Sequence, residues 1–310
     1  MIKFYHKTIK DQQPNILDEF KIGSWIYAEN PDTSEIEFLV NTFNIEIGLL
    51  NDALDPFEVP RLAIEKGIVY IFTRVPYKED GKISTEPVLV ALGETFVLTV
   101  SPKSLPFLEK FIESKIRYNT TQKTKLVLQI FSEITNSYNN FLTDIGRSVR
   151  SLSVEIEKVG NKDIVQFVNY ESILNDFLAA LVPTNTILNN LLSANFSVKA
   201  LELYEEDKEL IEDLFLSSGQ LIELCKTTLK TIVNIRESSS TLMTNNLNRV
   251  MKLLTSLTII LNVPMIVAGF YSMNVRLPFS QTNKVFWGLL GLSFTGSITL
   301  LIIFIKKKWI

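Results

Sequence analysis

A polar face runs along an otherwise apolar segment near the C-terminus. Alternating steps of three and four residues keep side chains on one face of a helix. Starting at Asn248, such steps meet the following residues, which we call the polar stripe: Asn248, Met251, Thr255, Thr258, Asn262, Met265, Gly269 and Ser272. Because an unpaired amide is costly in hydrocarbon, Asn262 must face either the inside of a helix bundle or a water-filled cavity.

Helix packing and a pore are the two interpretations of this stripe. Single Ser and Thr residues commonly join membrane helices, so one hydroxyl would not indicate a pore. The stripe as a whole favours a pore, since it continues to Asn248, beyond the apolar segment. It offers amide, hydroxyl and carbonyl oxygens but no carboxylate. Neutral oxygens suit a cation that keeps its water shell, and Mg²⁺ sheds water reluctantly.

Two segments are apolar enough to place the stripe in a membrane. They cover residues 253–271 and 285–305, close to the roughly 20 residues that cross a bilayer. Arg249 and Lys252 precede the first segment, and Lys306–Lys308 follow the second. The positive-inside rule therefore places both chain ends in the cytosol. Two helices cannot enclose a water-filled path, so several copies must surround a central axis.

The residues before the first span indicate an α/β region followed by long helices. β-rich runs occupy 67–75, 86–93 and 95–100. The segment KEDGK at 78–82 indicates a tight hairpin turn, because glycine tolerates a positive φ. Helices are expected at 34–43, 45–54, 105–117, 122–159 and 164–192. From about Val198 one very long helix is expected to continue into the first span.

Composition excludes several classes of function. The 310 residues are 46% hydrophobic with a mean hydropathy of +0.18, which indicates a soluble part joined to a membrane part. A net charge of −3 gives no basic surface for nucleic acid. The single Cys225 and the single His6 exclude an internal disulfide and any site with several such ligands. Since the sequence has no Walker motif and no nucleophile, base and orienter set, neither an enzyme nor an organic cofactor is expected.

The segment NRVMKLLTSLTIILNVPMIVAGFYSMNV, followed by a second span and KKKWI, resembles the membrane end of the CorA-type magnesium channels. In architecture the resemblance covers essentially the whole chain. It implies an α+β membrane protein and a funnel-shaped homopentamer, with a cytosolic α/β/α domain and a very long stalk helix that continues into the first of two transmembrane helices. The expected boundaries are 1–195 for the cytosolic domain with its helical bundle, 196–252 for the stalk, 253–274 for the first transmembrane helix and signature, 275–284 for the extracellular loop, 285–305 for the second transmembrane helix and 306–310 for a basic cytosolic tail.

The family carries a Gly-Met-Asn signature at the outer mouth, where a ring of asparagines holds a hydrated ion through its waters. Here Tyr271 precedes Ser272, Met273 and Asn274, and all four are assigned to the pore with the stripe. Glycine adopts a positive φ freely, whereas serine there costs about 1 kcal/mol or more. A left-handed Ser272 would distort the ring, and a helical or extended one would add a hydroxyl facing the ion's water. The loop 275–284 lacks acids, so capture would depend on Asn274.

The resemblance also implies a gate and a sensing site. An apolar ring near the membrane entrance corresponds to Leu254, with Met251 one turn earlier, and such a constriction closes by dewetting. In the family, Mg²⁺ bound between a carboxylate of one α/β domain and one of a neighbour's long helix holds the pore closed. Asp52 and Glu237 match those positions, and their repulsion without a cation would make them a switch. Without the resemblance, each acid would be interpreted as a solvated surface residue.

These observations predict passive influx of hydrated divalent cations, with Mg²⁺ as the first expectation, then Co²⁺ and Ni²⁺, and closure by cytosolic Mg²⁺. We expect a two-pass protein of the plasma membrane with both termini cytoplasmic. Its partners would be further copies of itself, lipid and divalent cations, and not nucleic acid. Two alternatives stay open: a zinc or other transition-metal transporter of the same superfamily, and a non-conducting scaffold or sensor in which Ser272 replaces the signature glycine.

Overall fold

The computed structural model describes residues 1–153, 159–193, 201, 203–273 and 283–310. Over these residues the chain divides into two compact units, Met1–Asn234 and Ile235–Ile310. Helix α6 (Glu205–Tyr271) contributes to both units without a break. The very long helix expected from the sequence is therefore confirmed, while the finer domain boundaries stay predictions.

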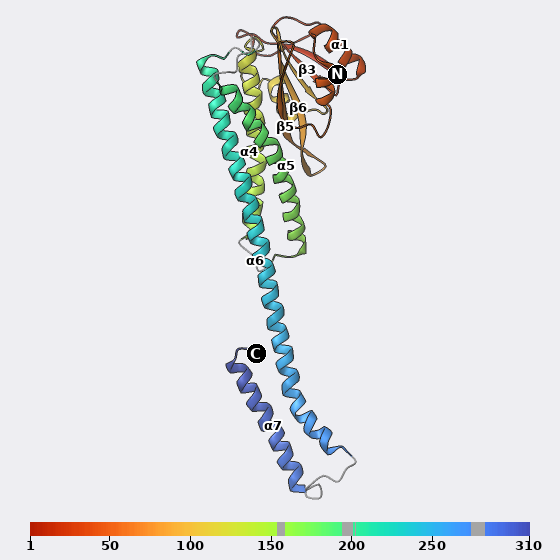
Figure 1. The fold of residues 1–310 in the computed structure, drawn as a ribbon, viewed down its shortest axis with the longest axis vertical. Helices are drawn as coiled ribbons and strands as arrows, with labels where there is room; N and C mark the ends of the chain where they lie inside the picture. Colours follow the sequence, from red (N-terminus) through yellow and green to blue (C-terminus); the bar gives the residue numbers. More distant parts are fainter. Residues whose placement is uncertain (154–158, 194–200, 202, 274–282) are drawn as a thin grey trace. The chain divides into compact units, whose positions relative to one another are not determined.

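A mixed β-sheet forms the centre of the first unit (Figure 1). Within the described residues it has seven strands in the order β2-β1-β3-β7-β6-β5-β4. The strands are β1 Ile2–His6, β2 Asn15–Leu17, β3 Ser24–Glu29, β4 Arg61–Glu65, β5 Ile68–Glu79, β6 Lys82–Leu92 and β7 Phe96–Ser101. All neighbours are antiparallel except β3 and β7, which run parallel and join the N-terminal strands to the later hairpins.

Asp80 and Gly81 close the long hairpin of β5 and β6. Glu79 pairs with Lys82, so the loop has two residues, with φ values of 49° and 80°. Two consecutive positive φ values define a type I′ turn, whose twist matches that of the strands. The hairpin predicted at 78–82 is confirmed.

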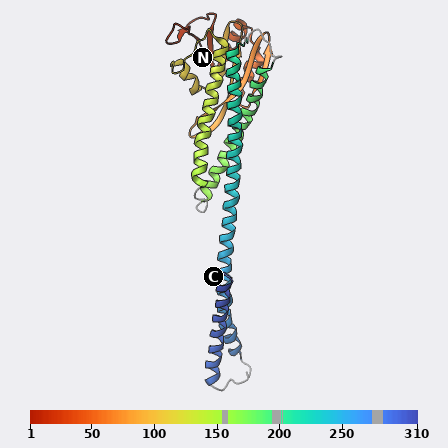
Figure 2. The ribbon, with the colours of Figure 1, turned by 90° about the vertical axis from the view of Figure 1, so that its left-hand side faces the viewer.

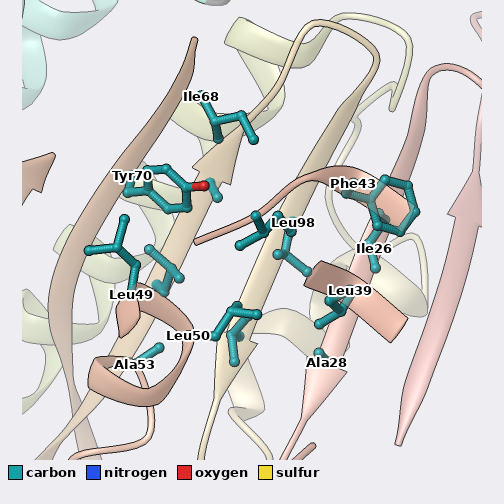
Figure 3. Close-up of a cluster of buried hydrophobic side chains, with 14 of the residues drawn as sticks. Ile26, Ala28, Leu39, Phe43, Leu49, Leu50, Ala53, Ile68, Tyr70 and Leu98 are labelled. Atoms are coloured by element: carbon teal, nitrogen blue, oxygen red, sulfur yellow. The ribbon is translucent and has the colours of Figure 1, made fainter. Parts of the chain in front are cut away.

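Helices α1 (Thr33–Phe43) and α2 (Ile47–Asp52) cover one face of the sheet (Figure 3). A capping box starts α1, because the Asp32 side chain accepts from the Glu35 amide at 2.9 Å and the Glu35 side chain accepts from the Asp32 amide. The buried residues of this layer include Ile26, Ala28, Leu39, Phe43, Leu49, Leu50, Ala53, Ile68, Tyr70 and Leu98. Their packing fixes α2, which carries Asp52 at its end.

Helices α4 (Lys123–Ser153) and α5 (Asn161–Leu192) lie on the opposite face, with the beginning of α6 alongside α4 (Figures 1 and 2). The Tyr138 hydroxyl of α4 donates to the Arg74 carbonyl of β5 at 2.9 Å. On α6, Cys225 is fully buried, and this burial raises the pKa of its thiol to about 12. Helices on both faces confirm the α/β/α architecture.

Two predictions for the first unit needed correction. The helix expected at 105–117 is shorter: α3 covers Pro106–Ile112, and Ser114 has a φ of 56°, which ends the helix in a left-handed residue. The strand runs named from the sequence correspond to β5, β6 and β7, whereas the sheet also contains β1 to β4, for which no bounds were predicted. These four are at most six residues long and give weak local patterns.

Candidate pore segment

Two helices of the described chain are long and apolar enough to cross a membrane: α6 and α7 (Asn283–Lys306). A core helix of a soluble protein would be mostly buried, yet 6% of the most apolar part of α6 and 11% of that of α7 are buried. In both views α7 lies alongside the C-terminal part of α6 (Figures 1 and 2). The two helices therefore present an apolar surface that suits lipid.

The polar stripe is exposed along its whole length on α6. Its exposed members are Asn248, Met251, Thr255, Thr258, Asn262, Met265, Gly269 and Ser272. Thr258 Oγ1 donates to the Leu254 carbonyl at 2.9 Å, so its hydroxyl is satisfied within the helix. The side-chain amide of Asn262 has no hydrogen-bond partner among the residues that the structure describes. An amide left unpaired on an apolar helix needs water or a polar partner, as the sequence predicted.

A different face of α6 packs against α7. Ser256 is fully buried, and Ile260 and Val263 are partly buried. At 3.6 residues per turn this face lies roughly 150° from the stripe. A Cβ added to Gly296 of α7 would lie 3.4 Å from Val263 Cγ1, so the helices are in close contact there. Ser256, which lies off the stripe, is thus a small residue of the packed face, and its hydroxyl donates to the Leu253 carbonyl of its own helix at 2.9 Å.

Ser272 continues the helical geometry of α6. Its amide donates to the Ala268 carbonyl at 3.0 Å, and its hydroxyl donates to the Gly269 carbonyl at 2.9 Å. Its φ is not positive, so the left-handed conformation that would favour glycine does not occur. Serine at this position therefore carries no backbone strain, and its hydroxyl proton is held by the helix.

The other signature residues lie on either side of Ser272. Tyr271 and Met273 are exposed, and the Met273 amide donates to the Phe270 carbonyl at 3.4 Å. Asn274 and the loop through 282 lie outside the described residues. The asparagine ring at the outer mouth stays a prediction.

A comparison with known proteins decides the family. A family model described as CorA-like Mg²⁺ transporter protein matches residues 21–307. The chain belongs to the CorA family. The cobalt/magnesium transport protein CorA of Methanocaldococcus jannaschii is 25% identical over 293 residues, which cover 92% of this chain and 91% of that protein. The putative metal ion transporter YfjQ of Bacillus subtilis is 23% identical over 289 residues, 92% of this chain and 89% of that protein.

Solved structures agree on the fold. The complete structure of the CorA magnesium transporter from Methanocaldococcus jannaschii has a TM-score of 0.87 and 23% identity, and the match covers 100% of this chain and 99% of that one. CorA-family proteins are membrane transporters of divalent cations rather than enzymes. The expected architecture of a soluble domain, a long helix and two membrane helices is confirmed.

Both residues assigned to the CorA-type gate are exposed on α6. The exposed fractions are 53% for Met251 and 60% for Leu254. Three residues apart, they differ by about 60° around the helix, so one symmetry axis cannot face both equally. Met251 lies within the polar stripe and Leu254 at its border, and the gate stays a prediction.

Asp52, predicted to sense cytosolic Mg²⁺, already has a cationic partner. Arg61 Nη2 lies 2.5 Å from Asp52 Oδ2, and Arg61 Nε lies 2.7 Å from Glu58 Oε1. The guanidinium also lies 4.3 Å from the ring centre of Phe72, which holds it in place. The carboxylate of Asp52 is therefore paired within its own unit, where it shares the single positive charge of Arg61 with Glu58, whereas the sequence suggested an unpaired acid.

Glu237, the other predicted sensing residue, belongs to the second unit. Its side chain is exposed, and its backbone carbonyl accepts from Thr241 Oγ1 at 2.9 Å. No group of three or more His, Cys, Asp or Glu side chains that could hold a metal occurs among the residues described. A regulatory site of two carboxylates from different subunits stays a prediction.

Three residues with evident roles were not singled out from the sequence. They are Arg61, Pro264 and Ser297. Arg61 follows Asp52 by nine residues across a turn, a spacing without a local signal. Pro264 stands inside the first span, and Ser297 lies in a run of small and hydroxyl residues in the second, which is a known mark of helix contacts. That run is the signal that could have found Ser297.

Proposed function

We propose that this chain forms a passive influx channel for hydrated divalent cations, with Mg²⁺ as the expected substrate. The observation that carries the proposal is the exposed polar stripe, which lies roughly 150° around α6 from the face that packs on α7. Neutral oxygens along this stripe can bind the water shell of an ion without stripping it. Co²⁺ and Ni²⁺ would be secondary substrates.

The proposed assembly is a homopentamer in the plasma membrane, with both termini in the cytosol. Two membrane helices per chain cannot enclose a water-filled path, so the stripes of several copies would have to line one axis. The number five rests on the resemblance to CorA-type channels. An inside-negative potential would drive the ion inward by about 4.6 kcal/mol per 100 mV for two charges.

The proposed regulation uses the same ion on the cytosolic side. Mg²⁺ bound between Asp52 of one subunit and Glu237 of a neighbour would hold the pore closed, and its loss would release the two subunits. Because Arg61 lies 2.5 Å from Asp52, the ion would have to displace this guanidinium or share the Asp52 carboxylate with it. The expected sensor is therefore weaker than one with two unpaired carboxylates.

A non-conducting scaffold is the less favoured alternative. Its specific support was Ser272 in place of glycine, and Ser272 has no positive φ and no strain. A zinc or other transition-metal transporter is the second alternative, and it differs from the proposal in the ion that moves. Measured ion flux separates all three.

The test is Mg²⁺ influx into proteoliposomes with a trapped fluorescent reporter under an imposed inside-negative potential. Wild type should conduct, and cobalt hexaammine, a mimic of hydrated Mg²⁺, should block it. Asn262→Leu should lower the flux about tenfold or more, because an apolar ring at mid-span favours dewetting. The matched control is Ser256→Ala, which removes a hydroxyl from the α7 face and should leave the flux unchanged.

Ser272→Gly should conduct as wild type does. Flux in the glycine variant alone would support the scaffold, and Zn²⁺ flux without Mg²⁺ flux would support the zinc transporter. An equal loss of Mg²⁺ flux in Asn262→Leu and Ser256→Ala would show that the stripe does not line the pore.

A further inference from the structure

Pro264 interrupts the hydrogen bonding of α6 in the middle of the first membrane span. Proline has no amide proton, so it cannot donate to the carbonyl four residues earlier. That carbonyl belongs to Ile260, on the face that packs against α7. In hydrocarbon an unpaired carbonyl costs several kcal/mol, because no water can replace the missing donor.

The missing donor comes from the other membrane helix. Ser297 Oγ of α7 donates to the Ile260 carbonyl at 3.1 Å, across 37 positions of sequence. The neighbouring hydroxyls of α7 behave differently: Ser293 donates to Leu290 and Thr295 donates to Gly291, both within their own helix. Ser297 therefore donates to the carbonyl that Pro264 leaves without its donor within α6, whereas the neighbouring hydroxyls bond within their own helix.

The helices are close enough at this point to hold the bond in place. Gly296, directly before Ser297, has Val263 Cγ1 within 3.4 Å of where its Cβ would lie. Ser256, on the same face of α6, is fully buried. A side chain larger than a methyl group at position 296 would meet Val263, push α7 away from α6 and lengthen the bond. Glycine at 296 and serine at 297 thus act together.

We propose that Ser297 is a positioning residue for the pore-lining helix. A proline frees the helix to bend where its hydrogen bond is lost, and α6 changes direction in its last turns (Figure 1). The part of the stripe after Pro264 consists of Met265, Gly269 and Ser272 and leads into the signature. By binding the Ile260 carbonyl, Ser297 fixes the direction of this part relative to α7. The transport consequence rests on the proposed function, whereas the hydrogen bond does not.

A double-mutant cycle tests the assignment. Ser297→Ala removes the donor, and Pro264→Ala returns a backbone amide that can satisfy the Ile260 carbonyl within α6. Ser297→Ala should therefore lower the thermal midpoint of the full-length, detergent-solubilised protein, and it should have no effect in the Pro264→Ala background. Ser297→Thr keeps the hydroxyl and should restore wild-type behaviour without any change at proline. Ser293→Ala is the matched control and should change nothing.

Ion block separates positioning from simple support of the fold. In proteoliposomes with equal amounts of assembled protein, Ser297→Ala should raise the half-blocking concentration of cobalt hexaammine about threefold, as expected for one membrane hydrogen bond. A residue that only stabilised the fold would lower the amount of assembled protein and leave this concentration unchanged. That result would overturn the positioning role.

The remaining outcomes also decide. Equal effects of Ser297→Ala with proline and with alanine at 264 would show that Ser297 does not serve the vacant carbonyl, and would overturn the proposal. Coupling in the thermal midpoints together with absent Mg²⁺ flux in wild type would support the hydrogen bond and reject the proposed function instead.

Discussion

The two units of this chain distribute their side chains in opposite ways. In the first unit, large apolar residues such as Trp25 and Phe177 are fully buried. In the second, Phe270 and Trp287 are 59% and 69% exposed, while the small hydroxyl residue Ser256 is fully buried. In the first unit the hydrophobic effect buries apolar side chains away from water. In the second unit apolar side chains can face lipid, so small and polar residues make the contacts between helices.

Helical hydroxyls bond within their own helix in both units, as Thr184 Oγ1 does with the Ala180 carbonyl at 2.8 Å in the first unit. The first unit also has side-chain contacts between distant elements, such as that of Thr73 Oγ1 with Thr184 Oγ1 at 3.0 Å. In the second, hydroxyls such as those of Thr258 and Thr295 mostly return to their own helix. Side-chain bonds between membrane helices therefore stand out, and Ser297 owes its bond to a carbonyl that proline left vacant.

The largest expected difference between the units is in the stability lost when one phenylalanine of each is truncated. Phe177→Ala should cost about 3–5 kcal/mol, because the ring is fully buried and packs edge-on against Tyr138 at 5.0 Å. Phe270→Ala should cost less than about 0.5 kcal/mol, because its ring faces the surrounding medium. Chemical unfolding in detergent, followed by circular dichroism, gives both values. Similar losses would mean that the assembly buries Phe270, which would break the contrast.

A matched pair of glycines on α7 tests the contact between the membrane helices. Gly296→Leu should cost about 1–3 kcal/mol, since the added side chain meets Val263. Gly288→Leu should have little effect, because no atom lies within 4 Å of its added Cβ. Thermal unfolding of the detergent-solubilised protein provides the comparison. Tolerance of leucine at 296 would contradict the close approach of the two helices.

The charged site of the first unit and the uncharged stripe of the second should respond to different substitutions. Arg61→Gln removes the guanidinium that competes with Mg²⁺ for Asp52, so the half-inhibiting cytosolic Mg²⁺ concentration should fall about threefold, as for a partly exposed ion pair. Block by external cobalt hexaammine should stay the same. The measurement is Mg²⁺ flux at graded internal Mg²⁺.

Lys66→Gln is the control for Arg61→Gln. It breaks the ion pair with Glu46 at 2.9 Å and does not touch Asp52. An unchanged half-inhibiting Mg²⁺ concentration in Arg61→Gln would show that Asp52 does not belong to the regulatory site.

The smallest expected effect is a pH dependence confined to the first unit, which holds the only histidine of the chain. Burial, and then the charge of Lys21, lower the pKa of His6 below its ordinary 6.5. The unfolded chain therefore binds more protons than the folded protein just below pH 6.5. Burial of a neutral His6 thus costs no stability above that pH, and the free energy of unfolding decreases as the pH falls below it. The thermal midpoint should drop less between pH 7.5 and 5.5 in His6→Asn than in wild type. An equal drop would show that carboxylates alone cause the acid sensitivity.

Local patterns account for what could be predicted from the sequence. The long helix and both spans follow from runs of apolar residues, and the hairpin at Asp80 and Gly81 follows from turn chemistry. The stripe could be identified because its members belong to a single helix with a fixed period. Each of these features depends on residues that are close in sequence.

Non-local contacts account for what could not be predicted. The parallel pairing of β3 with β7 joins residues about seventy positions apart, so β3 has no hairpin signal. The bond between Ser297 and Ile260 and the ion pair between Arg61 and Asp52 arise only when separate elements meet. For Ser272 the sequence left two conformations open, and the continuation of α6 through its amide selects one.

The burial of Cys225 has a practical consequence for watching this protein at work. With its pKa raised to about 12, the thiol is almost never a thiolate at neutral pH, and thiolates are the form that attacks labelling reagents. It is also the only cysteine of the chain. A cysteine introduced at an exposed position of either unit should therefore take up a spin label or fluorophore selectively in the wild-type background, with no native thiol to remove first.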